Sequence, residues 1–159
     1  MMDQIDSVIA SHAAADQPMT TFRAVDAALK SVAGHILFTV LISHHDTKES
    51  ERFYSNLPDA YPVGGKKPIT DHPLMKKLLG EGTHYIGYNA ADIAWAFFDH
   101  QLIHALGCES VINMPVRWQG RTIGTLNLLD RANAYHEDMI PAVRRIAQLA
   151  LPAMMMVAK

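Results

Sequence analysis

Two asparagines interrupt the most apolar stretch of the chain, VINMPVRWQGRTIGTLNLL, which runs from residue 111 to 129. Asn113 and Asn127 stand where a strand that served only for packing would carry valine or leucine. A buried amide costs about 1–3 kcal/mol unless it is hydrogen-bonded, so each asparagine needs a partner. That partner is either another protein group, which gives the amides a structural role, or a ligand in a pocket.

The turn between the two predicted strands decides how these amides are placed. A two-residue turn at 119–120 would put Asn113 and Asn127 on opposite faces of the sheet. A three-residue loop at 118–120 would set Asn113 beside Thr125 and put both asparagines on one face. Only the second arrangement predicts a polar pocket floor, and the sequence alone leaves both open.

Further candidates lie on the second predicted strand and in an aromatic segment. Arg52 and Tyr54 alternate in ERFYSNL, so we expect them to share a face, where the guanidinium could grip a carboxylate or phosphate. The alternative is a strand-edge arginine whose stem lies on the tyrosine. Trp95, Asp99 and His100 belong to WAFFDH, a composition that suits a ligand cavity or an ordinary core equally well.

The sequence gives little support for a catalytic site or a metal site. His100 and His104 lie four residues apart on a predicted helix, but Gln101 replaces the glutamate of the zinc-protease pattern and no third ligand is evident. An acid–base pair of Asp99 and His100 remains an alternative, although helical neighbours point about 100° apart. The single cysteine, Cys108, excludes an internal disulfide and is most simply a packed thiol. We therefore assign no catalytic residue, no metal and no particular cofactor.

Composition excludes several classes of partner. The chain has 159 residues, 49% of them hydrophobic, which predicts one core and a single domain over 1–159. A net charge of -2 gives no basic field, so nucleic acid is not an expected partner. The N-terminus lacks the basic region of a signal peptide, and no run approaches the ~20 apolar residues of a membrane span. We therefore expect a cytoplasmic protein.

Periodicity and turn residues give the elements that must position these candidates. Residues 1–34 predict two amphipathic helices, residues 35–130 the sheet and pocket elements, and residues 131–159 a C-terminal helix kinked at Pro152. Within the middle part, the expected strands are 35–43, 51–57, 84–88 and the two arms of 111–129; 61–70 is expected as loop, and 72–79 and 92–106 as short helices. Adjacent strands joined by short turns argue for an antiparallel sheet and an α+β fold.

The segment LGCESVINMPVRWQGRTIGTLNLLD resembles the last strand pair of a GAF domain. Pro115, Gly120, Ile123 and Gly124 match that pattern, and the upstream segments LFTVL, RFYSNLPDAYPVGGKKP and DIAWAFFDHQLIHALGCES are similar to small stand-alone bacterial GAF proteins. The resemblance covers about residues 37–151. It implies a central antiparallel sheet with the terminal helices on one face, often in a dimer, and a small-molecule pocket on the other.

GAF domains bind cyclic nucleotides, bilins, haem or other small molecules, and one enzymatic branch reduces free methionine sulfoxide. That branch needs a resolving thiol and places its key cysteine further upstream than Cys108, and a bilin-attaching cysteine would stand where the chain has Ala96 and Phe97. Our first hypothesis is therefore a sensor that binds a small polar or anionic metabolite non-covalently and dimerises through its terminal helices. The alternatives are an enzyme that kept the pocket and a structural dimer with a filled pocket. The predicted ligand-binding residues are Arg52, Tyr54, Trp95, Asp99, His100, Asn113, Thr125 and Asn127.

Overall fold

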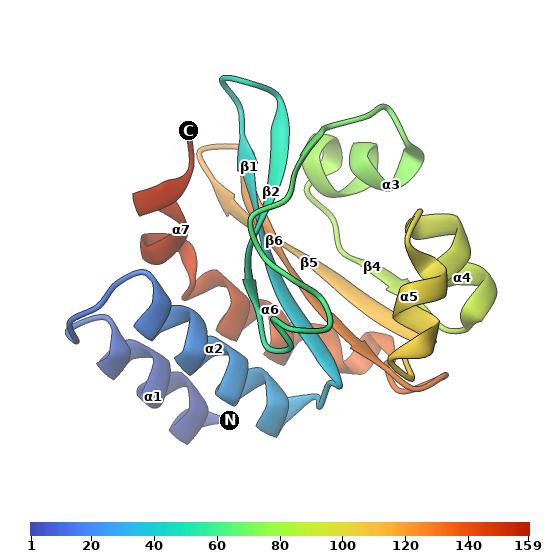
Figure 1. Cartoon of the computed structure of the whole chain (residues 1–159). Coiled ribbons are helices and arrows are strands. Elements are labelled where there is room, and N and C mark those ends of the chain that lie inside the picture. Colours follow the sequence, from blue (N-terminus) through green and yellow to red (C-terminus); the bar gives the residue numbers. More distant parts are fainter.

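The computed structural model describes all residues, Met1 to Lys159, and is built on one six-stranded antiparallel sheet (Figure 1). The strand order is β3-β2-β1-β6-β5-β4. The strands are β1 (Leu37–His44), β2 (Glu49–Ser55), β3 (Lys66–Pro68), β4 (Tyr85–Gly87), β5 (Ser110–Trp118) and β6 (Arg121–Asp130). The predicted α+β class is confirmed. The expectation of loop throughout 61–70 is wrong at β3, a short edge strand where Pro68 is tolerated because no further strand needs its missing N–H.

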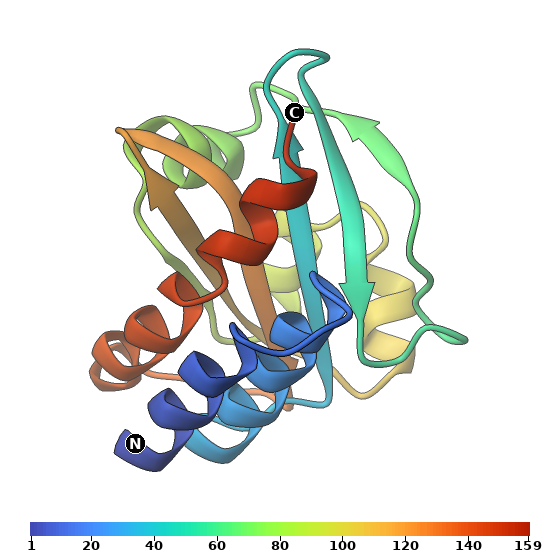
Figure 2. The same cartoon turned by 90° about the vertical axis from the view of Figure 1, so that its left-hand side faces the viewer.

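Helices cover both faces of the sheet. Figure 2 shows the terminal helices together on one face: α1 (Met2–Ser11), α2 (Met19–Val32), α6 (Ile140–Gln148) and α7 (Leu151–Val157). The other face carries α3 (Pro73–Met75), the π-helix η1 (Lys76–Glu81), α4 (Ala90–Ala96) and α5 (His100–Ala105), and the 3₁₀ turn η2 (Glu137–Met139) precedes α6. This is the arrangement expected from the resemblance.

Side-chain alternation along the central strands separates the two faces. Phe38, Val40 and Ile42 of β1 join the core beneath the terminal helices, together with Leu126 and Leu128 of β6. The residues between them point to the opposite face, because successive side chains of a strand alternate. The terminal helices therefore pack on an apolar face, and the other face is free to carry polar groups.

The β5–β6 hairpin differs from both of its predicted forms. Its turn has two residues, Gln119 and Gly120, with φ of 50° and 74°, the left-handed pair that a tight hairpin turn requires. The register then shifts between Val116 and Arg117, where Ile123 of β6 is the extra residue of a β-bulge. Because the bulge restores the face that the turn would have inverted, Asn113 lies directly opposite Asn127, and both asparagines share one face.

A second bulge corrects the prediction for β2. Leu41 of β1 pairs with Arg52, but the preceding Val40 pairs with Tyr54, so Phe53 is an extra residue in the ladder. Arg52 and Tyr54 were expected to share a face and instead lie on opposite faces of the sheet. The alternation rule failed here because it assumes an unbroken ladder.

The C-terminal segment is two helices rather than one kinked helix. The chain breaks between α6 and α7, ahead of Pro152, which falls in the first turn of α7 where its missing N–H costs nothing. No single helix is long and apolar enough to cross a membrane; residues Glu137–Gln148 and α7 meet the length and composition requirement only as a pair bent by 53°.

Candidate ligand-binding pocket

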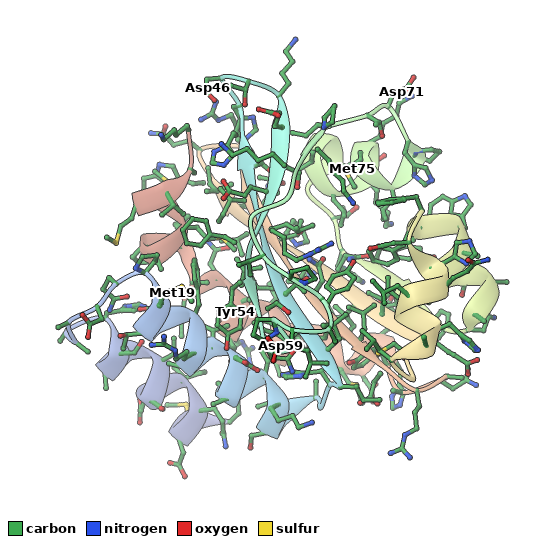
Figure 3. The ribbon with its side chains drawn as sticks, viewed as in Figure 1. Met19, Asp46, Tyr54, Asp59, Asp71 and Met75 are labelled. Carbon is green, nitrogen blue, oxygen red and sulfur yellow. The ribbon has the colours of Figure 1, made fainter.

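A cavity of about 330 Å³ lies on the sheet face opposite the terminal helices. Strands β1, β5 and β6 form its floor, and the helical segment that includes Met75, labelled in Figure 3, forms one wall. The segment between α4 and α5 and the chain from β2 through β3 close the remaining sides. Its size is at the lower end of the range typical for small-molecule sites.

Four polar side chains form the centre of the floor, here called the floor strip: Thr39, Asn113, Thr125 and Asn127. Asn113 Nδ2 donates to Asn127 Oδ1 over 2.6 Å, and Asn127 Nδ2 donates to Thr39 Oγ1 over 3.1 Å. Asn113 is only 2% exposed, and its Oδ1 has no hydrogen-bond partner. Hydrogen bonds therefore join Asn113, Asn127 and Thr39, and the buried Asn113 Oδ1 is left without a partner.

A charged cluster occupies one side of the cavity. The Arg52 guanidinium stacks on the ring of Tyr61 at 3.7 Å, donates to the Pro62 carbonyl over 2.9 Å and lies 3.8 Å from the Asp99 carboxylate. Tyr61 in turn donates to Asp99 over 2.8 Å. Burial raises the pKa of Tyr61 above its ordinary value, although the Arg52 charge opposes the shift, so the phenol remains a donor.

Lys67 and Phe98 meet at the rim of the cavity. The Lys67 ammonium lies 3.6 Å from the centre of the Phe98 ring, a cation–π contact that joins β3 to the segment between α4 and α5. Burial lowers the pKa of Lys67, and the neighbouring Asp99 carboxylate partly opposes that shift. Together with the charged cluster, this contact ties Phe98 and Asp99 to β3 and to the β2–β3 connection.

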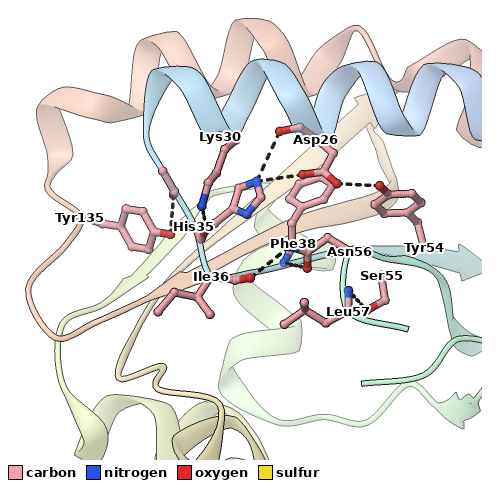
Figure 4. A network of polar contacts seen from close by, with 11 residues as sticks. Asp26, Lys30, His35, Ile36, Phe38, Tyr54, Ser55, Asn56, Leu57 and Tyr135 are labelled. Carbon is pink, nitrogen blue, oxygen red and sulfur yellow. Dashed lines mark hydrogen bonds and ion pairs between the residues drawn. The ribbon is translucent and has the colours of Figure 1, made fainter. Parts of the chain in front are cut away.

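Tyr54 lies outside the cavity, in a polar network beneath α2 (Figure 4). Its hydroxyl donates to Asp26 Oδ2 over 2.6 Å, and the same carboxylate lies 3.0 Å from His35 Nε2. Burial, reinforced by the hydrogen bond to Asp26, raises the pKa of Tyr54 above its ordinary value. The bulge at Phe53 thus makes Tyr54 a core residue that holds α2 to the sheet.

Trp95 and His100 also lie outside the cavity. Trp95 is 45% exposed and packs against Tyr85 and His72. His100 borders a separate, shallow surface hollow together with His104. Asp99 points instead toward Tyr61, so the alternative acid–base pair of Asp99 and His100 does not converge on one cavity. No three histidine, cysteine, aspartate or glutamate side chains come together as a metal site.

Cys108 is a packed thiol, as expected. It is fully buried in a small apolar cluster beside Leu37 and Ile103. Burial raises the pKa of the thiol to about 11, with the nearby Asp130 carboxylate contributing, so the reactive thiolate is disfavoured at neutral pH.

Sequence reasoning missed most of the cavity lining, including Thr39, Tyr61 and Lys67. Thr39 reads as an ordinary strand residue, and only its pairing with Asn127 reveals its role. Tyr61 and Lys67 lie in a segment rich in proline and glycine that was expected as loop. An aromatic residue inside such a loop was the available indication, because buried aromatics need a packing surface.

Comparison with known proteins finds one matching family model, over nearly half of the chain. Residues 79–153 match the GAF domain family model, a region that runs from η1 through the β5–β6 hairpin into α7. No curated protein matches the sequence.

Solved structures share the fold over most of the chain. The GAF domain of a two-component sensor histidine kinase from Bacillus halodurans has a TM-score of 0.68 at 13% identity, covering 85% of this chain and 92% of that one. The GAF domain from Acinetobacter phosphoenolpyruvate-protein phosphotransferase has a TM-score of 0.71 at 11% identity, covering 99% and 96%. Free methionine-R-sulfoxide reductase from Neisseria meningitidis, solved with its substrate, has a TM-score of 0.68 at 18% identity, covering 99% and 89%. At these identities the likeness establishes the fold.

Proposed function

Because the chain has the GAF fold and matches the GAF domain model over residues 79–153, we propose that it is a sensor domain. It binds a small polar molecule non-covalently in the cavity over the floor strip. Neighbours of the same fold include a sensor histidine kinase domain and a methyl-accepting chemotaxis protein, which supports a role in signal transduction.

The open cavity above the floor strip, with its unpaired acceptor, is the main support for this proposal. A cavity filled by its own side chains would leave no room at the floor strip, whereas this one retains about 330 Å³. Native proteins rarely leave a buried acceptor unpaired, and Asn113, which lines the floor of that space, has a buried Oδ1 without a hydrogen-bond partner. A bound molecule that donates a hydrogen bond would satisfy it.

Enzymatic reduction of a sulfoxide has less support, even though a reductase shares the fold. Such chemistry requires an accessible thiolate and a resolving thiol. Cys108 is fully buried and has no second cysteine to pair with.

Native mass spectrometry of the freshly purified chain tests the proposal. We expect a stoichiometric small-molecule adduct, either retained from the host or acquired from a metabolite extract. The Asn113→Leu variant should lose the adduct while keeping its circular dichroism spectrum, and Arg121→Ala, an exposed change outside the cavity, should keep it. A chain that acquires no adduct, or an adduct that Asn113→Leu binds unchanged, would refute the proposal.

We extend the proposal to a homodimer formed through the terminal helices. Large apolar side chains of α1 and α7 remain exposed on the helix-covered face, namely Met2, Ile9, Met155 and Met156. A second copy of the chain would cover them. Light scattering at micromolar concentration should give twice the monomer mass of 17.6 kDa, and a monomer mass would exclude this dimer.

A further inference from the structure

We infer that the cavity selects an electrically neutral molecule that donates an N–H or O–H to Asn113 and carries an apolar body, as a lactam or primary amide does. This specificity rests on the proposed binding function of the same cavity. It is narrower than the polar or anionic metabolite expected from the sequence.

The floor strip fixes which hydrogen-bonding role the ligand must take. Asn113 and Asn127 each donate along the strip, toward Asn127 Oδ1 and Thr39 Oγ1 respectively. Both bonds run in the same direction, from Asn113 to Asn127 to Thr39. The first member of this series, Asn113, therefore keeps an acceptor, Oδ1, that has no partner in the protein. A donor on the ligand completes the strip, whereas a ligand with only acceptors leaves Oδ1 unpaired.

Each charged side chain around the cavity already has a partner in the protein. A ligand carboxylate would compete with Asp99 for Arg52, which is also stacked on Tyr61 and bonded to a carbonyl. A ligand cation would compete with Arg52 and with the Tyr61 hydroxyl for Asp99. Lys67 lies on an exposed stretch of chain, its ammonium over the Phe98 ring, so its charge is screened by water.

The remaining titratable side chain of the cavity is also occupied. His72 Nδ1 accepts from the backbone N–H of Leu74 over 3.0 Å, and Nε2 lies 3.0 Å from the Trp95 carbonyl oxygen, to which it donates. Both ring nitrogens therefore have partners within the protein, and the imidazole offers a ligand no free nitrogen.

The walls above the floor strip are largely apolar. Apolar side chains around the strip include Leu41 and Leu129 on the same sheet face, Leu74 and Leu78 on the helical wall, and Phe97. Neutral polar groups at the centre of the floor and aliphatic or aromatic groups around them favour a molecule with one hydrogen-bonding edge and an apolar remainder.

Probes that differ by a single group test this specificity. We would titrate isotope-labelled protein with δ-valerolactam and ε-caprolactam, with their N-methyl derivatives, and with cyclohexanecarboxylate and cyclohexylamine of similar size. The readouts are chemical shifts of residues that line the cavity, including the side-chain amides of Asn113 and Asn127, and the dissociation constants derived from them. The variants are Asn113→Leu and the matched control Arg121→Ala.

We expect the two lactams to bind in the cavity and N-methylation to weaken binding at least about tenfold, because Oδ1 then stays unpaired. Asn113→Leu should abolish the difference between a lactam and its N-methyl derivative, and Arg121→Ala should preserve it. Equal affinity for the N-methyl derivatives, or tighter binding of the carboxylate or the amine, would overturn the specificity and leave the proposed sensor function intact. If no probe of any class shifts the cavity residues, the proposed function itself fails.

Discussion

Replacing the two floor asparagines one at a time should affect stability very unequally. Asn127 makes both bonds of the floor strip, so Asn127→Leu leaves the buried Asn113 Nδ2 without an acceptor and removes the donor to Thr39. An unsatisfied buried group costs about 1–3 kcal/mol and an ordinary hydrogen bond contributes about 1 kcal/mol, which together predict a loss of about 2–4 kcal/mol. Asn113→Leu leaves Asn127 Oδ1 unpaired but removes an acceptor that was already unpaired, so the two effects nearly cancel, to within about 1 kcal/mol.

The double variant provides the decisive comparison. Removing both partners of a buried hydrogen bond is close to neutral, so Asn113→Leu with Asn127→Leu should be more stable than Asn127→Leu alone by about 1–3 kcal/mol. Urea unfolding followed by the fluorescence of Trp95 and Trp118 measures all four proteins, with an unchanged m-value as the check that two-state analysis holds. A double variant less stable than Asn127→Leu, or equal losses in the two single variants, would refute the described geometry.

Two further predictions concern the sheet and the phenols. Gly124→Ala should destabilise the fold by about 1–3 kcal/mol in the same urea assay, because its Cβ would lie 2.3 Å from the backbone oxygen of Leu41. Gly80→Ala, whose Cβ would meet no atom within 4 Å beyond its own helix, should cost nothing, and equal effects would contradict the close approach at Gly124. Burial raises the pKa of Tyr54 and Tyr61, so above about pH 10 the unfolded chain releases protons that the folded chain retains, and the free energy of unfolding should fall with rising pH in alkaline urea titrations. A flat profile between pH 9 and 11 would refute that prediction.

The types and order of most elements could be predicted from the sequence because they depend on local patterns. The helical spacing of Phe22, Val25 and Leu29 and the glycine after α5 placed those elements well. The edge strand β3 was not predicted, because its three exposed residues, one of them a proline, show no alternation of polar and apolar side chains. The break ahead of Pro152 was anticipated only approximately, because proline suits the first turn of a new helix as well as a kink.

The residues that line the cavity were harder to predict, because each of the two bulges changes which side chains face it. A single extra residue exchanges the faces of everything beyond it, and neither Phe53 nor Ile123 differs in type from ordinary strand residues. Arg52, Asp99, Asn113, Thr125 and Asn127 are brought together around the cavity, and the remaining three predicted residues are not. Contacts between segments distant in sequence, such as Tyr61 with Asp99, leave no local pattern at all.

The alternation along β6 sets how a signal would travel in the proposed sensor. Thr125 and Asn127 line the cavity, and Leu126 and Leu128 between them pack beneath the terminal helices. Adjacent residues of one strand thus face the cavity and the terminal helices, and no other side chain lies between these two sides of the strand. If a ligand displaced β6, the terminal helices would feel the displacement one residue away. How far the helices move would then depend on the stiffness of the sheet rather than on a series of side-chain rearrangements.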